Sequence, residues 1–289
     1  MVYIIRNKTR RIRTFFKDLI TRIIKDDFMG MAAEMAYIFI LAFFPFMIFL
    51  VSLFGIFGSE DQIYRVIDFL NEVTPLQFMG TVERTLMNVM YSSSKELVTI
   101  GFVTTLFLAS NAAVVSIKGM NKAYHRKETR NFWHIRLLSV FIILLNGIVM
   151  FFGTNMIVFG RVIIDFFNQF IDISSAFEST ILFIRWPIAF LGLFIMAFLN
   201  YYFMPNIKKL GFRKKIAYTV PGALFFCVFW LLASWIFGLY VENFGSYDKV
   251  YGTLGAFAVL LLWLYYTSLI ILIGGEINFQ VYKKFLNHY

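Results

Sequence analysis

Six long apolar segments follow one another along the chain, separated by polar pieces. Each has more than 20 residues and contains no Asp, Glu, Lys, Arg or His. An α-helix needs about 20 apolar residues to cross a hydrocarbon layer of about 30 Å. The pattern therefore predicts an all-α fold, a polytopic membrane protein with six transmembrane helices. The segments are Met35–Ser59, Leu97–Ile117, Leu137–Gly160, Trp186–Ile207, Ile216–Val241 and Val250–Gly275.

Two of the polar pieces are amphipathic. Before the first span, apolar residues recur at helical spacing from Ile12 to Ile24, with Arg and Lys on the other faces. This pattern predicts an interfacial helix, an anchor beside anionic headgroups or, as the alternative, a lipid sensor. The first outer loop, Glu60–Glu96, has two such stretches separated by Pro75. We expect two short amphipathic helices there, because proline interrupts a helix.

Composition supports one integral-membrane domain over residues 1–289. The chain has 60% hydrophobic and 15% charged residues, and its mean hydropathy is +0.72. Soluble domains have about 25% charged residues, and no polar piece is long enough to form a separate core. We expect an amphipathic cytoplasmic flank at 1–30, a six-helix membrane core at 31–278 and a cytoplasmic tail at 279–289.

The distribution of Lys and Arg predicts the orientation. The pieces expected on one side carry eight, six, five and two of these residues, and those on the other side carry three, two and one. Because cytoplasmic loops are enriched in Lys and Arg, both termini should be cytoplasmic. The Lys and Arg residues that set this orientation explain the net charge of +10, so the charge does not require a nucleic-acid partner. Candidate contacts to anionic lipid headgroups are Lys118, Lys122, Arg126, Lys208, Lys209 and Arg213.

Two carboxylates flank the predicted core. Glu34 directly precedes the first span and Glu276 directly follows the last, so the topology places both at the cytoplasmic boundary. Each is a candidate for proton coupling if it is desolvated, or a hydrated boundary carboxylate paired with a Lys or Arg. If the first and last spans are neighbours, the two could share one site.

Amides and prolines lie deeper in the spans. Asn111, Asn146 and Asn200 would hydrogen-bond between helices or line a solvated cavity. Pro45 and Pro221 lie inside spans, where each predicts a packing kink or a break that lines a pathway. Pro187, in contrast, is expected in the first turn of its helix, where the missing N–H has no cost.

Signatures of enzymes are scarce. The chain has one cysteine, three histidines and no HExxH, GxSxG or P-loop pattern. We therefore expect no metal, no cofactor and no catalytic residue.

Five stretches, taken in order, carry a family resemblance. They are Ala32–Tyr37 with Phe43–Pro45, Asn121–Tyr124, Tyr201–Pro205, Pro221–Ala223, and Tyr251–Gly255 with Leu262–Tyr265 and Gly274–Asn278. Together they resemble the YihY/BrkB family of bacterial inner-membrane proteins, formerly called ribonuclease BN-like. The resemblance implies six helices and cytoplasmic termini in a bacterial plasma membrane. It adds Tyr37 and Asn278 to the candidate pathway residues.

Three functions follow as hypotheses. The first is a transporter or lipid-translocating protein without its own ATPase, because the family is connected with envelope integrity and with export of envelope components. The second is a structural or assembly protein of the envelope, with protein partners there. The third is a membrane-bound ribonuclease, for which the sequence offers no cluster of metal ligands. Membrane lipids are the expected partners of the first.

Overall fold

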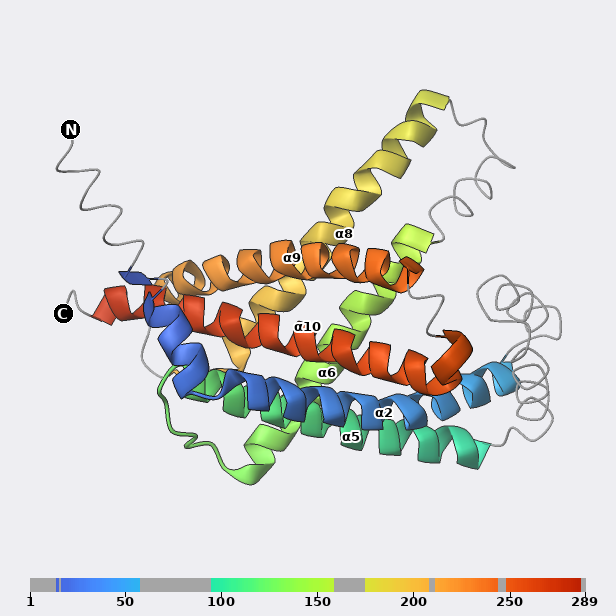
Figure 1. Ribbon diagram of the computed structural model, residues 1–289, viewed down its shortest axis with the longest axis horizontal. Helices are drawn as coiled ribbons and strands as arrows, with labels where there is room; N and C mark the ends of the chain where they lie inside the picture. Colours follow the sequence, from blue (N-terminus) through green and yellow to red (C-terminus); the bar gives the residue numbers. More distant parts are fainter. Residues whose placement is uncertain are drawn as a thin grey trace. The chain divides into compact units, whose positions relative to one another are not determined.

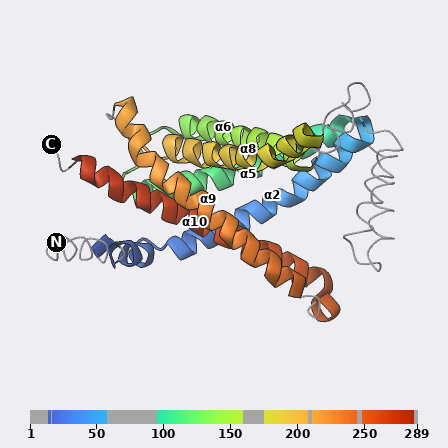
Figure 2. The ribbon, with the colours of Figure 1, turned by 90° about the horizontal axis from the view of Figure 1, so that it is seen from above.

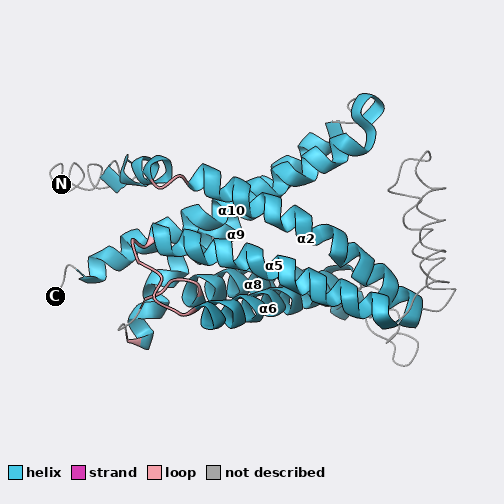
Figure 3. Cartoon of the chain, turned by 90° about the horizontal axis from the view of Figure 1, so that it is seen from below, coloured by secondary structure: helices cyan, strands magenta, loops and turns pink. Residues whose placement is uncertain are grey.

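The computed structural model describes residues 14–15, 17–57, 95–158, 175–207, 211–243 and 248–286. This part of the chain contains helices and no strand (Figure 3), which confirms the all-α prediction. The long helices are α2 (Phe28–Phe57), α5 (Lys95–Ala123), α6 (Phe132–Val158), α8 (Ser175–Phe203), α9 (Phe212–Asn243) and α10 (Asp248–Leu286). The amphipathic helices predicted in the first outer loop lie outside the described residues.

Five stretches of these helices are long and apolar enough to cross a membrane. They are Val98–Ala123, Phe132–Val149, Phe183–Phe203, Phe212–Tyr240 and Phe257–Lys283. A shorter apolar stretch, Phe28–Phe43, begins α2. The chain is therefore a multi-pass membrane protein, and the count of six spans stays a prediction.

The helices are longer than the apolar segments, with two consequences for the predicted site. Helix α10 does not end at Gly275 but continues through Glu276 to Leu286, so Glu276 lies within a helix. Helix α8 begins at Ser175, so the expectation that Pro187 occupies a first turn is wrong. Polar side chains are tolerated at the ends of spanning helices because these ends reach the headgroup region, and charge-free windows therefore underestimate helix length.

The chain forms two compact units, each described here by itself. Unit 1 contains residues 1–36 and 112–289, and unit 2 contains residues 37–111. In unit 2, the later part of α2 packs closely on α5. A Cβ atom on Gly101 would lie 3.1 Å from the Phe49 backbone, and the Phe49 and Phe102 rings are 5.4 Å apart. Glycine at position 101 permits this close approach.

In unit 1, α10 lies beside α9, α9 beside α8, and α8 beside α6 (Figures 1 and 2). Helices α9 and α10 approach each other closely at Gly222 and Gly274. A Cβ on Gly222 would collide with the Gly274 carbonyl, and a Cβ on Gly274 would collide with the Tyr201 side chain of α8. The neighbouring Gly275 faces Met120 of α5 in the same way. Small residues thus bring three helices together where the Gly274–Asn278 sequence lies.

The N-terminal flank is helical over residues 17–25 and turns at Asp26 and Asp27 before α2 begins. Asp27 has a φ of 53°, and its Oδ1 accepts a hydrogen bond of 3.2 Å from the Gly30 N–H, which caps α2. Two apolar side chains of this short helix, Ile20 and Ile24, are 57% and 69% exposed. The described residues confirm a helix here, and its position in the membrane interface stays a prediction.

Candidate functional site

Polar and aromatic side chains, most of them buried, gather at one end of unit 1, where the N-terminal helix, the turn after α5, and helices α9 and α10 meet. We call this group the polar end cluster. Its members are Arg22, Asp26, Tyr124, His125, Tyr218, Glu276, Asn278, Phe279 and Tyr282. The Gly222–Gly274 contact brings α9 and α10 together beside it.

Glu276 is the buried carboxylate of the cluster. Its side chain is fully buried on α10, and its Oε1 lies 3.3 Å from Nη1 of Arg22 in the N-terminal helix. The amide of Gln280, one turn further along α10, donates a longer bond of 3.4 Å to the same oxygen. The other oxygen, Oε2, has no hydrogen-bond partner among the described residues. An ionised carboxylate is costly at such a place, and Arg22 offsets that cost by neutralising it.

Arg22 is shared between two acceptors. Its Nη1 also lies 2.7 Å from Nε2 of His125, the residue that turns the chain after α5 with a φ of 49°. Burial and the neighbouring Arg22 cation lower the pKa of His125, so the neutral imidazole that accepts from Arg22 is favoured. Asp26 lies 4.0 Å from the same Nε2 on the N-terminal helix side. The arrangement ties this short helix to the ends of α5 and α10.

Asn278 on α10 forms a hydrogen bond with α9 next to Pro221. Its Oδ1 accepts a hydrogen bond of 2.6 Å from the backbone N–H of Gly222, which directly follows Pro221. Pro221 has no N–H of its own, so α9 lacks one ladder hydrogen bond there. Two predicted candidates, Pro221 and Asn278, are therefore parts of one interhelical contact. The Nδ2 of Asn278 has no partner among the described residues.

Four aromatic rings of the cluster pack against one another. Tyr124 lies between 5.7 and 6.1 Å from the rings of Tyr218, Phe279 and Tyr282, measured between centroids. Arg126 donates a hydrogen bond of 2.7 Å to the Tyr282 hydroxyl. Burial, reinforced by the negative charge that nearby groups can carry, raises the pKa of Tyr124 well above its usual value near 10. The Tyr124 hydroxyl therefore keeps its proton at any physiological pH.

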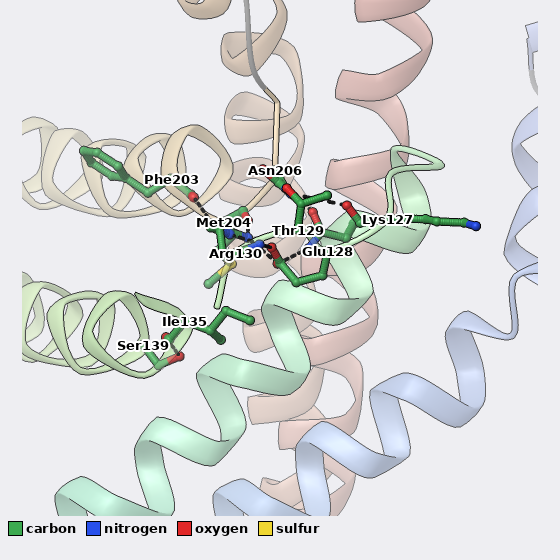
Figure 4. Close-up of polar contacts among 10 residues, drawn as sticks. Lys127, Glu128, Thr129, Arg130, Ile135, Ser139, Phe203, Met204 and Asn206 are labelled. Carbon is green, nitrogen blue, oxygen red and sulfur yellow. Dashed lines mark hydrogen bonds and ion pairs between the residues drawn. The ribbon is translucent and has the colours of Figure 1, made fainter. Parts of the chain in front are cut away.

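A second polar network joins the loop after α5 to the end of α8 (Figure 4). Arg130 makes an ion pair of 2.6 Å with Glu128 and donates to the backbone carbonyl of Met204 at 2.8 Å, where α8 has just ended. Asn121 donates to the same carboxylate at 2.6 Å and accepts from the Asn206 N–H at 2.7 Å. Burial alone would raise the pKa of Glu128, but its bonds to Arg130 and Asn121 lower it to about 2.

The amides predicted in two spans form a reciprocal pair. Asn146 on α6 and Asn200 on α8 exchange hydrogen bonds of 3.3 and 3.0 Å. This is the interhelical use that was one of the two alternatives for these residues.

The remaining candidates differ in exposure. Glu34 is exposed on α2, and the charged partner of Glu276 is Arg22 rather than a second carboxylate. Tyr37 is 60% exposed, and Pro45 and Asn111 are half-buried in unit 2. Among the headgroup candidates, Lys118, Lys122, Arg126 and Arg213 are exposed, whereas Lys208 and Lys209 lie outside the described residues.

Several residues of the cluster and of the second polar network were missed from the sequence. Arg22 was placed only on the polar face of an amphipathic helix, and nothing local indicates that its partner lies more than 250 residues away. Tyr124 and Asn121 had a usable signal, since both belong to a stretch that carries the family resemblance. Within the described ranges, no group of three His, Cys, Asp or Glu side chains is arranged to hold a metal ion.

Comparison with known proteins identifies the family. A family model described as virulence factor BrkB matches residues 19–288. The chain belongs to the BrkB family. The ribonuclease-like protein YfkH of Bacillus subtilis is 32% identical over 272 residues, which cover 94% of this chain and 96% of that protein. A UPF0761 membrane protein of Vibrio campbellii is 26% identical over 91% of this chain and 81% of its own length. No solved structure matches.

Proposed function

We propose that this BrkB-family protein is a transporter or lipid-translocating protein of the bacterial plasma membrane, without its own ATPase and with both termini in the cytoplasm. The observation that carries the proposal is the buried Glu276 on α10, within a stretch apolar enough to span a membrane. Ionisable residues at such positions typically mark substrate or ion pathways, because their burial is otherwise unfavourable.

The way Glu276 is neutralised also supports transport. Its counterion, Arg22, comes from a short helix outside the spans rather than from a packed neighbouring span. A counterion on a surface helix can be withdrawn without repacking the membrane core. Helix α9 lacks one backbone hydrogen bond at Pro221, and the next N–H, that of Gly222, donates to the Asn278 amide. This position is a suitable place for a hinge.

Lipids are the substrate class tested first. The full chain is reconstituted into vesicles of phosphatidylethanolamine and phosphatidylglycerol that contain a trace of fluorescent phospholipid. Dithionite added outside destroys the fluorescence of the outer leaflet only, so further loss reports movement between leaflets. We expect faster loss than in protein-free vesicles, and at least tenfold slower movement with Glu276→Gln.

The matched control is Asp18→Asn, which removes an exposed carboxylate from the N-terminal helix and should leave the rate unchanged. Glu34→Gln tests whether the exposed carboxylate on α2 contributes to the same step. Size-exclusion chromatography and circular dichroism confirm that each variant is folded. Movement no faster than in empty vesicles, for these lipids and for cardiolipin, would contradict lipid translocation.

A structural or assembly role in the envelope is the second candidate. The contact that favours it is the network of Glu128, Arg130 and Asn206, which fixes two loops to each other and could present them to a partner. Crosslinking in cells distinguishes the two functions, because this role requires a stable protein partner and transport does not. The name of the Bacillus relative adds a nuclease hypothesis, which cleavage of tRNA by the purified chain with Mg²⁺ or Zn²⁺ would support.

A further inference from the structure

One nitrogen atom of the polar end cluster faces two partners of opposite charge. Nε2 of His125 lies 2.7 Å from Nη1 of Arg22 and 4.0 Å from Oδ2 of Asp26. Both partners belong to the N-terminal helix, where the Asp26 N–H donates to the Arg22 carbonyl at 2.8 Å and the two side chains are one turn apart. A cation and an anion of one short helix therefore compete for the same atom of His125.

The backbone holds His125 in this position. Its N–H donates to the Lys122 carbonyl at 3.0 Å, and the Arg126 N–H donates to the Asn121 carbonyl at 2.8 Å. Together with the φ of 49° at His125, these two bonds form a Schellman motif, which ends α5. The Phe279 ring of α10 packs against the imidazole with 5.2 Å between the ring centroids. The imidazole is thus fixed from both its own backbone and α10.

The chemistry of the two partners determines where the protons are. A guanidinium N–H can only donate, so Nε2 accepts from Arg22 and the proton of the neutral imidazole is on Nδ1. Asp26 suits the opposite state, because a carboxylate oxygen can only accept and needs a protonated Nε2. Its Oδ2 is buried and has no hydrogen-bond partner among the described residues, whereas buried polar atoms nearly always have one.

We propose that His125 exchanges its partner on protonation, from Arg22 to Asp26, and that this exchange is a pH-sensitive switch on the N-terminal helix. The lone pair of Nε2 takes a proton from water, which reaches the imidazole because this side chain is 48% exposed. Nε2 then donates to Oδ2 of Asp26 after the two atoms approach by about 1 Å, the difference between 4.0 Å and an ordinary hydrogen bond. Arg22 loses its bond to His125 and keeps its contacts with Glu276 and the Phe279 ring.

The switch connects the pH at the surface with the counterion of a buried carboxylate. While His125 is neutral, Arg22 is shared between the imidazole and Oε1 of Glu276, which lies 3.3 Å away. Once His125 is protonated, Glu276 no longer competes with the imidazole for this guanidinium. The regulation of transport by this switch rests on the proposed function, whereas the exchange of partners is a property of the cluster itself.

The charged groups around His125 act in both directions. Arg22 and Lys25 on the N-terminal helix and Lys283 on α10 oppose a positive imidazole, and Asp26 favours it. Burial and then the Arg22 cation lower the pKa of His125, and the Asp26 carboxylate raises it. Removing the charge of Arg22 should therefore move the titration of His125 to higher pH, and removing the charge of Asp26 should move it to lower pH.

Solid-state NMR of the full chain in lipid vesicles tests the exchange and needs no transport. The ¹⁵N shifts of the histidine rings show which nitrogen lacks a proton, and His125→Gln identifies the resonances of His125. In the neutral form this nitrogen should be Nε2. The distance from Nε2 to the side-chain carboxyl carbon of Asp26, measured by ¹⁵N–¹³C dipolar recoupling, should shorten as His125 is protonated.

Charge-removing variants of the N-terminal helix measure the two opposing effects on the titration midpoint of His125. Arg22→Gln should raise this midpoint, and Asp26→Asn should lower it. Asp18→Asn removes the same charge as Asp26→Asn from an exposed position of the same helix, so it is the matched control and should move the midpoint far less. If Arg22→Gln does not fold because Glu276 has lost its counterion, the double variant Arg22→Gln/Glu276→Gln gives the same readout.

Three results would overturn the switch. One is a neutral His125 that lacks its proton on Nδ1, which contradicts acceptance from Arg22. The others are a distance between Nε2 and the Asp26 carboxyl that stays constant through the titration, and a midpoint that Asp26→Asn does not lower. None of these measurements depends on whether lipid moves in the vesicle assay, so failure of the switch and failure of the proposed function are distinguishable.

Discussion

Neutralising Glu128 by Glu128→Gln should loosen the link between the loop after α5 and the end of α8. In the native protein this carboxylate bonds to Arg130 at 2.6 Å and receives the Asn121 amide, also at 2.6 Å. Arg130 in turn reaches the carbonyls of Phe203 and Met204, which the end of α8 leaves without intrahelical donors. Gln keeps the size of the side chain but removes the charge that holds Arg130.

The size of the effect follows from the pKa of Glu128. Bonds to Arg130 overcome the effect of burial and lower this pKa from 4.5 to about 2, and the difference corresponds to about 3 kcal/mol at 1.36 kcal/mol per unit. The side chain is 23% exposed, so solvent screening reduces the expected loss to about 1–3 kcal/mol. Because the folded-state pKa is lowered, this stabilisation is complete above about pH 4.5 and is lost as the pH falls toward 2.

Thermal unfolding in detergent, repeated between pH 3 and pH 8, measures the loss. At neutral pH Glu128→Gln should lower the midpoint by about 3–10 °C, and it should flatten the decline of stability in acid. A double-mutant cycle with Arg130→Met should give a coupling energy above about 1 kcal/mol. Additive single effects, together with an unchanged acid profile, would refute the reasoning.

Three further predictions concern packing and pH. Gly222→Ala should destabilise the protein by about 1–3 kcal/mol, because its Cβ would collide with α10, whereas Gly238→Ala on the open side of α9 should be neutral or slightly stabilising in the same unfolding assay. Asn146→Leu should cost about 1 kcal/mol, and a double-mutant cycle with Asn200→Leu should show a coupling energy of about 0.6–1.7 kcal/mol; no coupling would mean that the amide pair is inert. Since burial and Arg22 lower the pKa of His125, stability should decline as the pH falls below about 6.5, and His125→Gln should abolish that step in a pH series of unfolding midpoints.

The membrane fold was predictable because the apolar sequence of each spanning helix is itself the signal for that helix. About 20 uncharged residues are sufficient evidence of a span, whatever the rest of the chain does. The ends of the helices were less predictable, since Glu276 and Lys283 continue α10 although a charge-free window stops before them. A polar side chain after an apolar segment is compatible with the end of the helix and with its continuation. For Glu276 the residue that pairs with it, Arg22, is distant in sequence.

The candidate site was predicted in parts but not as a unit. Glu276 and Asn278 were singled out from the sequence as pathway candidates, and the structure joins Asn278 to the Pro221 region through Gly222. Their other partners, Arg22 and Tyr124, come from elements whose packing no local pattern specifies. Pairings between residues so far apart depend on how the helices cross. Close contacts at glycines determine this crossing geometry, and the hydropathy pattern does not.

The partner of Glu276 changes what this carboxylate can do. Two carboxylates in one site would repel each other, and one of them would have to hold a proton at rest. Arg22 instead lies 3.3 Å from Glu276 and offsets the charge of the carboxylate when it is ionised. Protonation of Glu276 would remove this ion pair, whereas the contacts of Arg22 with Phe279 and His125 would remain.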